Sequence, residues 1–397
     1  MPDTARIDRP TPEELLARAT AMKPALKERA QRCEQLRRIP GETIAEFEAA
    51  GFFRVLQPVE YGGYAHDPIV MLRMLTEIAS ACSSSAWVLG VLMLHNWEVA
   101  LMPRQAGIDV WGKDSGVRIS SSYAPFGKLE KVEGGVKVSG RWPYSSGSDH
   151  CTWAFLGGMV PAFTNGEPPG MVAVLISRDD YRVEDKWHVS GLEGTGSNDI
   201  VVEGAFVPDH RVHVIQNETK RTYDDSQYDE DTFKYPFFSI FGAALAATSL
   251  GMAKGALEEF IAQNKSRLSA FSGQAYREDP LVQSRVARAW ALTDAAELKR
   301  ERDFSEMAAR IAARQPLLDA DRVRNKWDSV WTAHAADEAI DLIYKVAGGN
   351  ASYLTNPLQR FYRDISTAAN HVYLQFDRGA SNFGSFLLTG NINDPQR

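Results

Sequence analysis

The sequence has few of the features that mark secreted or membrane proteins. Only three of its 397 residues are cysteines, Cys33, Cys82 and Cys151, and they are odd in number and far apart. This usage indicates reduced thiols rather than a disulfide framework. No apolar run approaches the ~20 residues of a membrane span, and the polar start, Met-Pro-Asp-Thr-Ala-Arg, lacks the apolar stretch of a signal peptide. We therefore expect a cytoplasmic protein with no membrane partner.

The chain also lacks the usual signatures of nucleic-acid, metal and dinucleotide sites. Its formal net charge is -7, whereas a surface that binds nucleic acid needs an excess of Lys and Arg. Its eight histidines form no HExxH motif and no Cys/His cluster, so we expect no metal site. There is no Walker A sequence and no GxGxxG turn after a predicted strand. A nucleotide-like cofactor would have to be held without a Rossmann turn.

What the sequence does contain is a periodicity that changes twice. Apolar residues recur at helical spacing from residue 11 to about 115, and from about 117 they alternate as in strands. Helical patterns then return over 237–273, 279–313, 317–347 and 357–388. We predict three domains, namely an N-terminal helical domain over 1–116, a β domain over 117–215, and a C-terminal helical bundle over 216–397 that starts with a polar, acidic linker at 217–231.

The β region contains one stretch with an unusual composition, Arg141–Gly158. It follows a predicted hairpin turn at residues 134–135. Residues 145–148 (Ser-Ser-Gly-Ser) are small, and Trp142 and Trp153 flank them. Hydroxyls and backbone N–H groups suit the edge of a heteroaromatic ring, and tryptophans suit its face. The alternative is a serine-rich turn whose tryptophans belong to the core.

The order of elements and several motifs resemble the acyl-CoA dehydrogenase family. Phe53–Gly63 is similar to the family's segment ending in Tyr-Gly-Gly, and Gly191–Pro208 is similar to the end of its β domain. Ala347–Gly349 and Pro357–Asp364 are similar to its closing pair of helices. The resemblance implies a mainly α fold with a central β domain, in which an N-terminal helical domain and a C-terminal four-helix bundle accompany a β-barrel-like middle domain.

The chemistry that the resemblance implies is not that of a dehydrogenase. Acyl-CoA dehydrogenases remove a proton with a glutamate, and Ile365–Asp377, where we would expect it, contains no glutamate. Ile119–Gly127 and Ser139–His150 resemble instead the oxygenase components of two-component flavin monooxygenases on this fold, such as p-hydroxyphenylacetate hydroxylase and 3-hydroxy-seco-androstatrienedione hydroxylase. Those enzymes take reduced flavin from a separate NAD(P)H-dependent flavin reductase. They then hydroxylate a small aromatic, a phenol, an indole or a steroid-derived phenol, with O₂ through a C4a-hydroperoxyflavin.

The same resemblance assigns catalytic and substrate-binding residues. It places His95 at the hydroxyl of the substrate, where a side chain that titrates near neutral pH is suitable. It places Ser146 beside flavin N5, and His371 where it would tune peroxide formation or relay a proton. Trp87 and Ser121 would bind the substrate. Strand alternation lets only one face of 120–122 (Ser-Ser-Ser) point inward, and which serine does so stays open.

For the cofactor, the resemblance implies reduced FMN, with reduced FAD as the alternative, and a homotetramer. Arg267 and Phe271 match the segment through which a neighbouring subunit reaches the flavin phosphate, and an arginine fork binds phosphate oxygens in pairs. The alternative for Arg267 is an exposed helix arginine. The full set of expected cofactor contacts is Ser146, Thr195, Gly196, Ser197, Arg267, Phe271, Asn350, Ala351 and Ser352.

Other functions remain open at this point. A monooxygenase of the same fold that oxidises nitrogen or sulfur would need no histidine to orient a phenol. An acyl-CoA dehydrogenase is disfavoured by the missing glutamate, and a helical scaffold without activity by the small residues and histidines at matching positions. We assign the remaining histidines to surface or loop positions: His66, His150, His188, His210, His213 and His334.

Overall fold

The computed structural model describes residues 9–160, 170–220, 222–269, 273–392 and 394. In the N-terminal part these residues form α1 (Pro12–Leu36), α2 (Gly41–Ala49), α3 (Pro68–Ala79), α4 (Ser83–Val99) and α5 (Arg104–Trp111). The first helix begins where its sequence predicts, because Thr11 and Glu14 form a capping box. The Glu14 backbone N–H donates to Thr11 Oγ1 at 3.2 Å, and the Thr11 N–H donates to Glu14 Oε2 at 2.7 Å.

A seven-stranded mixed sheet follows, in the order β5-β6-β2-β1-β3-β4-β7. Gly134, with a φ of 73°, makes the predicted turn between β1 and β2. β1 is one long strand whose pairing with β3 shifts register between Ser122 and Gly127. The strands are β1 (Ile119–Val132), β2 (Gly135–Ser145), β3 (Trp153–Val160), β4 (Gly170–Ser177), β5 (Tyr181–Glu184), β6 (Asn198–Pro208) and β7 (Val212–His213).

The C-terminal part is helical. The single helix predicted over 357–388 is wrong, because α9 ends at Ala369 and α10 starts at Phe376. Between them Tyr373 is buried and its hydroxyl donates to the Phe238 carbonyl at 2.9 Å, so the chain turns inward there. The helices are α6 (Phe237–Asn264), α7 (Pro280–Ala312), α8 (Asp319–Tyr344), α9 (Pro357–Ala369) and α10 (Phe376–Thr389).

α6 is the central helix of this arrangement. Contrary to the expectation from sequence, its length of 28 residues and mean hydropathy of 1.4 would allow it to cross a membrane, but 83% of that apolar window is buried inside the protein. α6 also packs closely against α3, since a Cβ on Gly251 would lie 2.4 Å from the Thr76 carbonyl oxygen. The burial is that of a core helix.

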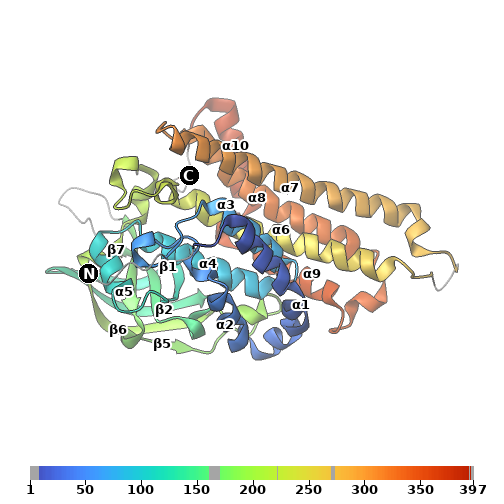
Figure 1. Cartoon of the computed structure of the whole chain (residues 1–397), viewed down its shortest axis with the longest axis horizontal. Helices are drawn as coiled ribbons and strands as arrows, with labels where there is room; N and C mark the ends of the chain where they lie inside the picture. Colours follow the sequence, from blue (N-terminus) through green and yellow to red (C-terminus); the bar gives the residue numbers. More distant parts are fainter. Residues whose placement is uncertain (1–8, 161–169, 221, 270–272, 393, 395–397) are drawn as a thin grey trace.

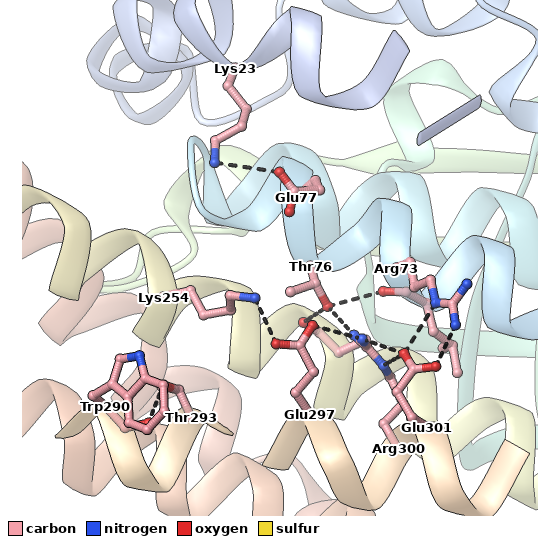
Figure 2. Close-up of polar contacts among 12 residues, drawn as sticks. Lys23, Arg73, Thr76, Glu77, Lys254, Trp290, Thr293, Glu297, Arg300 and Glu301 are labelled. Carbon is pink, nitrogen blue, oxygen red and sulfur yellow. Dashed lines mark hydrogen bonds and ion pairs between the residues drawn. The ribbon is translucent and has the colours of Figure 1, made fainter. Parts of the chain in front are cut away.

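Polar contacts attach the N-terminal helices to the C-terminal bundle (Figure 2). Arg73 of α3 pairs with Glu301 of α7 at 3.1 Å, and Arg300 Nη1 donates to Thr76 Oγ1 at 2.8 Å. The exposed pair contributes little by itself, whereas the nearly buried guanidinium of Arg300 needs its partners. Figure 1 shows the result, with the sheet at one end, the N-terminal helices across the middle and α6–α8 extending to the other end.

Candidate active site

The face of α4 that carries Trp87 and His95 forms one wall of the candidate site. The two residues are eight positions apart, so they lie about two turns from each other on one side of the helix. α4 is apolar all round and buried along almost its whole length. Val91, midway between the two, is the one residue of this helix that is not buried. The face from Trp87 to His95 therefore borders accessible space.

Both ring nitrogens of His95 have partners. Nδ1 lies 2.9 Å from Glu98 Oε2, one helical turn further on, and Nε2 lies 2.8 Å from Ser121 Oγ of β1. His95 and Glu98 are fully buried, whereas Ser121 is partly exposed. The predicted histidine and the predicted substrate serine are thus in direct contact, at the edge of the space that water reaches.

The structure also decides which serine of β1 faces this space. Ser120 is buried and accepts a hydrogen bond from Ser145 Oγ at 3.0 Å. The Ser122 hydroxyl donates to the Pro143 carbonyl at 2.6 Å. Ser121 lies on the opposite face of the strand, as alternation requires. Of the three alternatives, Ser121 is therefore the one that reaches His95.

Behind His95 lies a buried group of charged side chains that sequence reasoning missed. Glu98 Oε1 is 2.8 Å from His213 Nδ1, and His213 Nε2 is 3.0 Å from Glu218 Oε1. Tyr123 of β1 donates its hydroxyl to Glu98 Oε2. We call His95, Glu98, Tyr123, His213 and Glu218 the Glu98 cluster. A lone acid three residues after a histidine, on an otherwise apolar helix, is the sequence signal that could have pointed to it.

The ionisation of the Glu98 cluster follows from these contacts. Burial raises the pKa of Glu98, but hydrogen bonds from His213 and His95 outweigh it and bring the pKa to about 2. Burial lowers the pKa of His213, but its bonds to Glu218 and Glu98 raise it to about 9. At neutral pH the pair is therefore a carboxylate beside an imidazolium. Burial and the charge of Glu98 raise the pKa of Tyr123 well above its ordinary value, so its hydroxyl stays protonated.

Three of the sequence-based assignments are corrected here. His213 is buried on β7 and is neither a surface nor a loop residue, and His334 lies half-buried within α8. The segment 217–231 is not solvated throughout, because Glu218 and Tyr228 within it are buried. The sequence around these residues is polar and gives no sign that they are buried. His213, for example, contacts Glu98, which lies 115 positions away in the sequence.

His371, the second predicted histidine, lies in the break between α9 and α10. Its Nδ1 accepts the backbone N–H of Tyr373 at 3.2 Å. Burial lowers the pKa of His371 to about 4, so the imidazole is neutral at physiological pH. Its ring centre is 6.0 Å from that of Trp87 and 6.2 Å from that of Phe241. The break that the sequence did not predict is thus what brings His371 to the site.

Aromatic rings connect the two histidines. Tyr123 contacts His95 at 5.8 Å between ring centres and Phe241 of α6 at 5.6 Å, edge to face. Phe241 in turn contacts His371, and both of these rings are partly exposed although their surroundings are buried. The rings of Trp87, Tyr123 and Phe241 thus lie near one polar pair, His95 and Ser121, a combination that suits an aromatic compound with one polar group. Sequence reasoning identified neither Tyr123 nor Phe241.

A second polar group forms where β2 ends. Ser146 Oγ lies 2.7 Å from Ser197 Oγ, which lies 2.7 Å from Thr195 Oγ1. The Gly147 N–H donates to the Thr195 carbonyl at 2.8 Å, joining the two loops. Gly196, with a φ of 53°, gives its loop a left-handed turn that glycine adopts easily. The structure therefore brings the predicted Ser146, Thr195, Gly196 and Ser197 together.

This second group fits the polar edge of a flavin ring. Its hydroxyls can each donate or accept, which matches a ring edge that alternates N–H, N and C=O groups. The Ser148 hydroxyl is buried and has no hydrogen-bond partner among the described residues. A Cβ on Gly147 would lie 2.7 Å from Val88 of α4, so the turn packs tightly onto the helix that carries Trp87 and His95. The two polar groups thus share one wall.

The tryptophans of this stretch have different roles from the one considered for them. Trp142 is fully buried, and its Nε1 donates to the Gly157 carbonyl at 2.7 Å inside the β domain. It is a core residue, as in the alternative considered from sequence. Trp153 is half-buried beneath the Arg211 guanidinium, 5.0 Å from the ring centre. Neither ring adjoins the hydroxyls of Ser146 and Ser197 through a described contact.

The predicted phosphate contacts form a third group at the far end of the bundle. Arg267 Nη1 donates to the Ala347 carbonyl at 2.6 Å, and its guanidinium lies over the Tyr276 ring at 4.3 Å. A Cβ on Gly348 would lie 2.7 Å from Arg267 Nη2, so loop and arginine are in contact. Beyond Gly348, Ala351 is buried while Asn350 and Ser352 are exposed. Phe271 lies outside the described residues.

The phosphate group and the ring-edge group belong to different parts of the fold. The connection between α6 and α7, which contains Arg267, lies in Figure 1 at the end of the bundle away from the sheet. No described contact joins Arg267 to the group of Ser146 within one copy of the chain. This arrangement is consistent with a flavin held by residues of two copies.

Comparison with known proteins shows which protein family the fold belongs to. Residues 11–104 match the family described as acyl-CoA dehydrogenase, N-terminal domain, and residues 243–376 match acyl-CoA dehydrogenase, C-terminal domain. Together these matches span more than half of the chain, and they confirm the predicted fold class.

Individual relatives show which enzymes within this family the chain is similar to. The chain is 39% identical to the flavin-dependent monooxygenase oxygenase subunit HsaA of Rhodococcus jostii (strain RHA1), over 93% of this chain and 97% of the relative. It is 30% identical to the FADH(2)-dependent resorcinol hydroxylase, oxygenase component, of Rhizobium sp. (strain MTP-10005), over 94% of each. The crystal structure of 3-HSA hydroxylase from Rhodococcus sp. RHA1 superposes with a TM-score of 0.91 at 37% identity, covering 97% of this chain and 99% of that one.

The chain therefore belongs to the oxygenase subunits of flavin-dependent monooxygenases built on the acyl-CoA dehydrogenase fold. It is an enzyme that uses a reduced flavin, as its sequence predicts. The individual roles of the predicted site residues remain predictions, and the geometry above shows which of them can act together.

Proposed function

We propose that the chain hydroxylates a small aromatic compound that carries a ring hydroxyl. The observation that carries this proposal is the pair of His95 Nε2 and Ser121 Oγ, 2.8 Å apart at the edge of an aromatic enclosure. A phenol has one polar group on an apolar ring. The pair of His95 and Ser121 would bind the hydroxyl, and the neighbouring aromatic side chains would pack against the ring. A substrate oxidised at nitrogen or sulfur would have no use for a histidine held in this way.

The reduced flavin, when bound, activates O₂ and supplies the oxygen atom that is transferred. The chain's own residues do the rest. His95 accepts the proton of the substrate hydroxyl at Nε2, which makes the ring richer in electrons and directs attack beside the oxygen. Tyr123, Phe241 and Trp87 orient the ring and exclude water. Ser146, Ser197 and Thr195 hold the polar edge of the flavin ring.

The experiment compares phenols with their methyl ethers. The purified chain is supplied with FMN or FAD, O₂, NADH and a general flavin reductase, and products are identified by mass spectrometry across phenols, indoles and steroid-derived phenols. We expect phenols to gain one oxygen atom and the matched methyl ethers to be left unchanged while H₂O₂ is released. Oxygenation of indoles or sulfur heterocycles in preference to every phenol would contradict the proposal.

We further propose that reduced FMN is the preferred flavin, with reduced FAD as the alternative. Arg267 and the exposed loop residues Asn350 and Ser352 would hold the phosphate that both flavins carry. The relative named as FADH(2)-dependent resorcinol hydroxylase supports the alternative. Anaerobic titration with each reduced flavin measures the two dissociation constants, and tighter binding of FAD would overturn the preference for FMN.

The remaining partners are also proposals. A separate NAD(P)H-dependent flavin reductase would supply the flavin, a view supported by relatives named as oxygenase subunits or components. A homotetramer would bring Arg267 of one copy to the group of Ser146 of another, which is supported by the absence of a described contact between them within one copy. Cys33, Cys82 and Cys151 are buried free thiols, which supports a reducing, cytoplasmic location.

A further inference from the structure

We propose that Glu98 is a positioning residue of the substrate site, which holds the His95 proton on Nδ1 and so leaves Nε2 to accept the proton of the substrate hydroxyl. The inference rests on the proposed hydroxylation of a phenol. It adds a role for the Glu98 cluster, which lies behind the residues proposed to contact the substrate.

The partners of His95 decide its tautomer. A neutral imidazole carries one N–H, and an ionised carboxylate can only accept. Because Glu98 Oε2 lies 2.9 Å from Nδ1, the proton of His95 belongs on Nδ1. Nε2 is then an acceptor, and it points at Ser121 Oγ and the accessible space. The other described contact of Nδ1 is the Tyr123 hydroxyl at 3.3 Å, which can donate or accept and so does not by itself fix the tautomer.

Glu98 acts this way only if it keeps its charge in the interior, where an isolated carboxylate would take up a proton. His213 supplies the compensating charge at 2.8 Å, and Glu218 holds His213 from the other side at 3.0 Å. The pKa of about 2 for Glu98 and about 9 for His213 agree with this assignment. Tyr123 adds a hydrogen bond to the oxygen of Glu98 that faces His95.

The same arrangement favours the proton transfer itself. As the substrate gives up its proton, its O–H bond breaks, the electron pair stays on oxygen, and an N–H bond forms at Nε2. The resulting imidazolium at His95 lies beside the Glu98 carboxylate, which stabilises it at short range in a medium of low polarity. The proton on Nε2 returns to the oxygen of the product, and His95 ends the cycle neutral.

The first test uses flavin-free protein, so it does not depend on turnover. 4-Nitrophenol is bound as a chromogenic phenol, and its absorbance is followed against pH. We expect the bound phenol to ionise at lower pH in the wild type than in Glu98→Gln. ¹⁵N NMR of histidine-labelled protein, assigned with His95→Asn, should show Nε2 unprotonated in the wild type and protonated in part of the Glu98→Gln molecules. An unchanged ionisation and an unchanged tautomer would overturn the proposal.

A matched control separates this role from a merely structural one. Asp328 is also a buried carboxylate, but it lies in α8 and pairs with Lys299 at 2.6 Å. Asp328→Asn should leave both readouts as in the wild type, even where it lowers stability. If Glu98→Gln does not fold, Glu218→Gln replaces it, because it alters the same chain of contacts two residues further from His95, beyond His213. A shift in the same direction supports the proposal, and no shift contradicts it.

The second test is turnover with phenols of increasing acidity. We expect Glu98→Gln to lower hydroxylation by on the order of 10²- to 10⁴-fold for weakly acidic phenols, the range of general-base contributions and of tautomer loss elsewhere. The loss should shrink for acidic phenols and at high pH, where the substrate ionises without help, and Glu98→Asp should restore part of the rate. A wild type that hydroxylates no phenol would refute the proposed function. A wild type matched by Glu98→Gln would refute only this inference.

Discussion

Ser146 Oγ lies 2.7 Å from Ser197 Oγ, although 51 positions separate the two residues in the sequence. The contact joins the end of β2 to the loop before β6, and Thr195 extends it on the far side. A chain of three hydroxyls can rearrange its donors to suit a ring edge without leaving a buried polar group unpaired. The predicted catalytic serine is therefore one member of a group.

We predict that Ser146→Ala raises the release of H₂O₂ in the absence of substrate. The hydroxyl should hold the flavin ring edge, and one hydrogen bond is worth about 0.5–1.5 kcal/mol, hence roughly three- to tenfold in rate. The rate of peroxide release per oxygenase is measured without substrate, with the reductase in excess so that it does not limit the rate. Ser139→Ala is the control, because the Ser139 hydroxyl accepts the Gly204 N–H on exposed strands. An unchanged rate of peroxide release would return Ser146 to the class of ordinary turn serines.

His95→Ala should separate flavin binding from hydroxylation. Since His95 contacts Ser121 and Glu98, and no described contact links it to the group of Ser146, we expect flavin affinity to be nearly unchanged. Hydroxylation should fall by on the order of 10²- to 10⁴-fold, with O₂ released as H₂O₂ instead. His188→Gln, at an exposed histidine outside the site, serves as the control. Equal hydroxylation by His95→Ala and wild type would leave His95 a core residue.

Arg267→Ala should weaken the binding of reduced flavin. A hydrogen bond to a charged group contributes about 1.5–3 kcal/mol, so the dissociation constant should rise roughly ten- to a hundredfold. Arg267→Lys should recover only part, because lysine lacks the fork. Anaerobic titration measures both variants, with Arg277→Ala as the control, since Arg277 is exposed and binds only the Lys265 carbonyl among its described hydrogen bonds. If Arg267→Ala bound reduced flavin as tightly as the wild type does, the flavin phosphate would not bind at Arg267.

We expect light scattering of the purified chain to give the mass of four copies. The reason is that no described contact joins Arg267 to the group of Ser146 within one copy, which favours a flavin site shared between copies. Pairs of such sites close symmetrically when dimers associate. A monomer that hydroxylates at full rate would contradict both the tetramer and the shared site.

The pair of Glu98 and His213 should make stability depend on pH. The folded pKa of His213 is raised to about 9, so its contribution is fully present below its unfolded value of about 6.5 and is lost as pH rises toward 9. That of Glu98 is lowered to about 2, so its contribution is present above about 4.5 and is lost as pH falls toward 2. The pair should therefore stabilise most between these limits, near pH 5 to 6.

The measurement is urea unfolding at pH 6 and pH 9. Between these values the wild type should lose more unfolding free energy than His213→Gln does, by up to about 3 kcal/mol at 1.36 kcal/mol per pKa unit. His188→Gln, at an exposed histidine, should follow the wild type. Parallel pH dependence in wild type and His213→Gln would mean that His213 is not charged in the folded protein.

Much of the architecture could be predicted from local signals. The change from helical to alternating period near residue 117, the turn at residues 134–135 and the start of α1 at Thr11 all depend on neighbours within a few positions. The break at residues 370–375 could not be predicted in this way, because the helical pattern continues across it. The chain turns there to bury Tyr373 against α6, a contact that spans 135 positions.

For the site, motifs in the sequence were enough to identify the short segments that contain the predicted catalytic and binding residues. Motifs identified the surroundings of His95, Ser121, Ser146 and Thr195, and the structure brings these into two adjoining groups. The sequence could not show which of the three serines of β1 faces His95. Strand alternation requires that one face points inward, but it does not say which face. The tertiary structure decided that choice, the core position of Trp142 and the partnership of Glu98 with His213. The physical reason is that period and turn chemistry act over a few residues, whereas the charge state of a buried carboxylate depends on whatever packing places beside it.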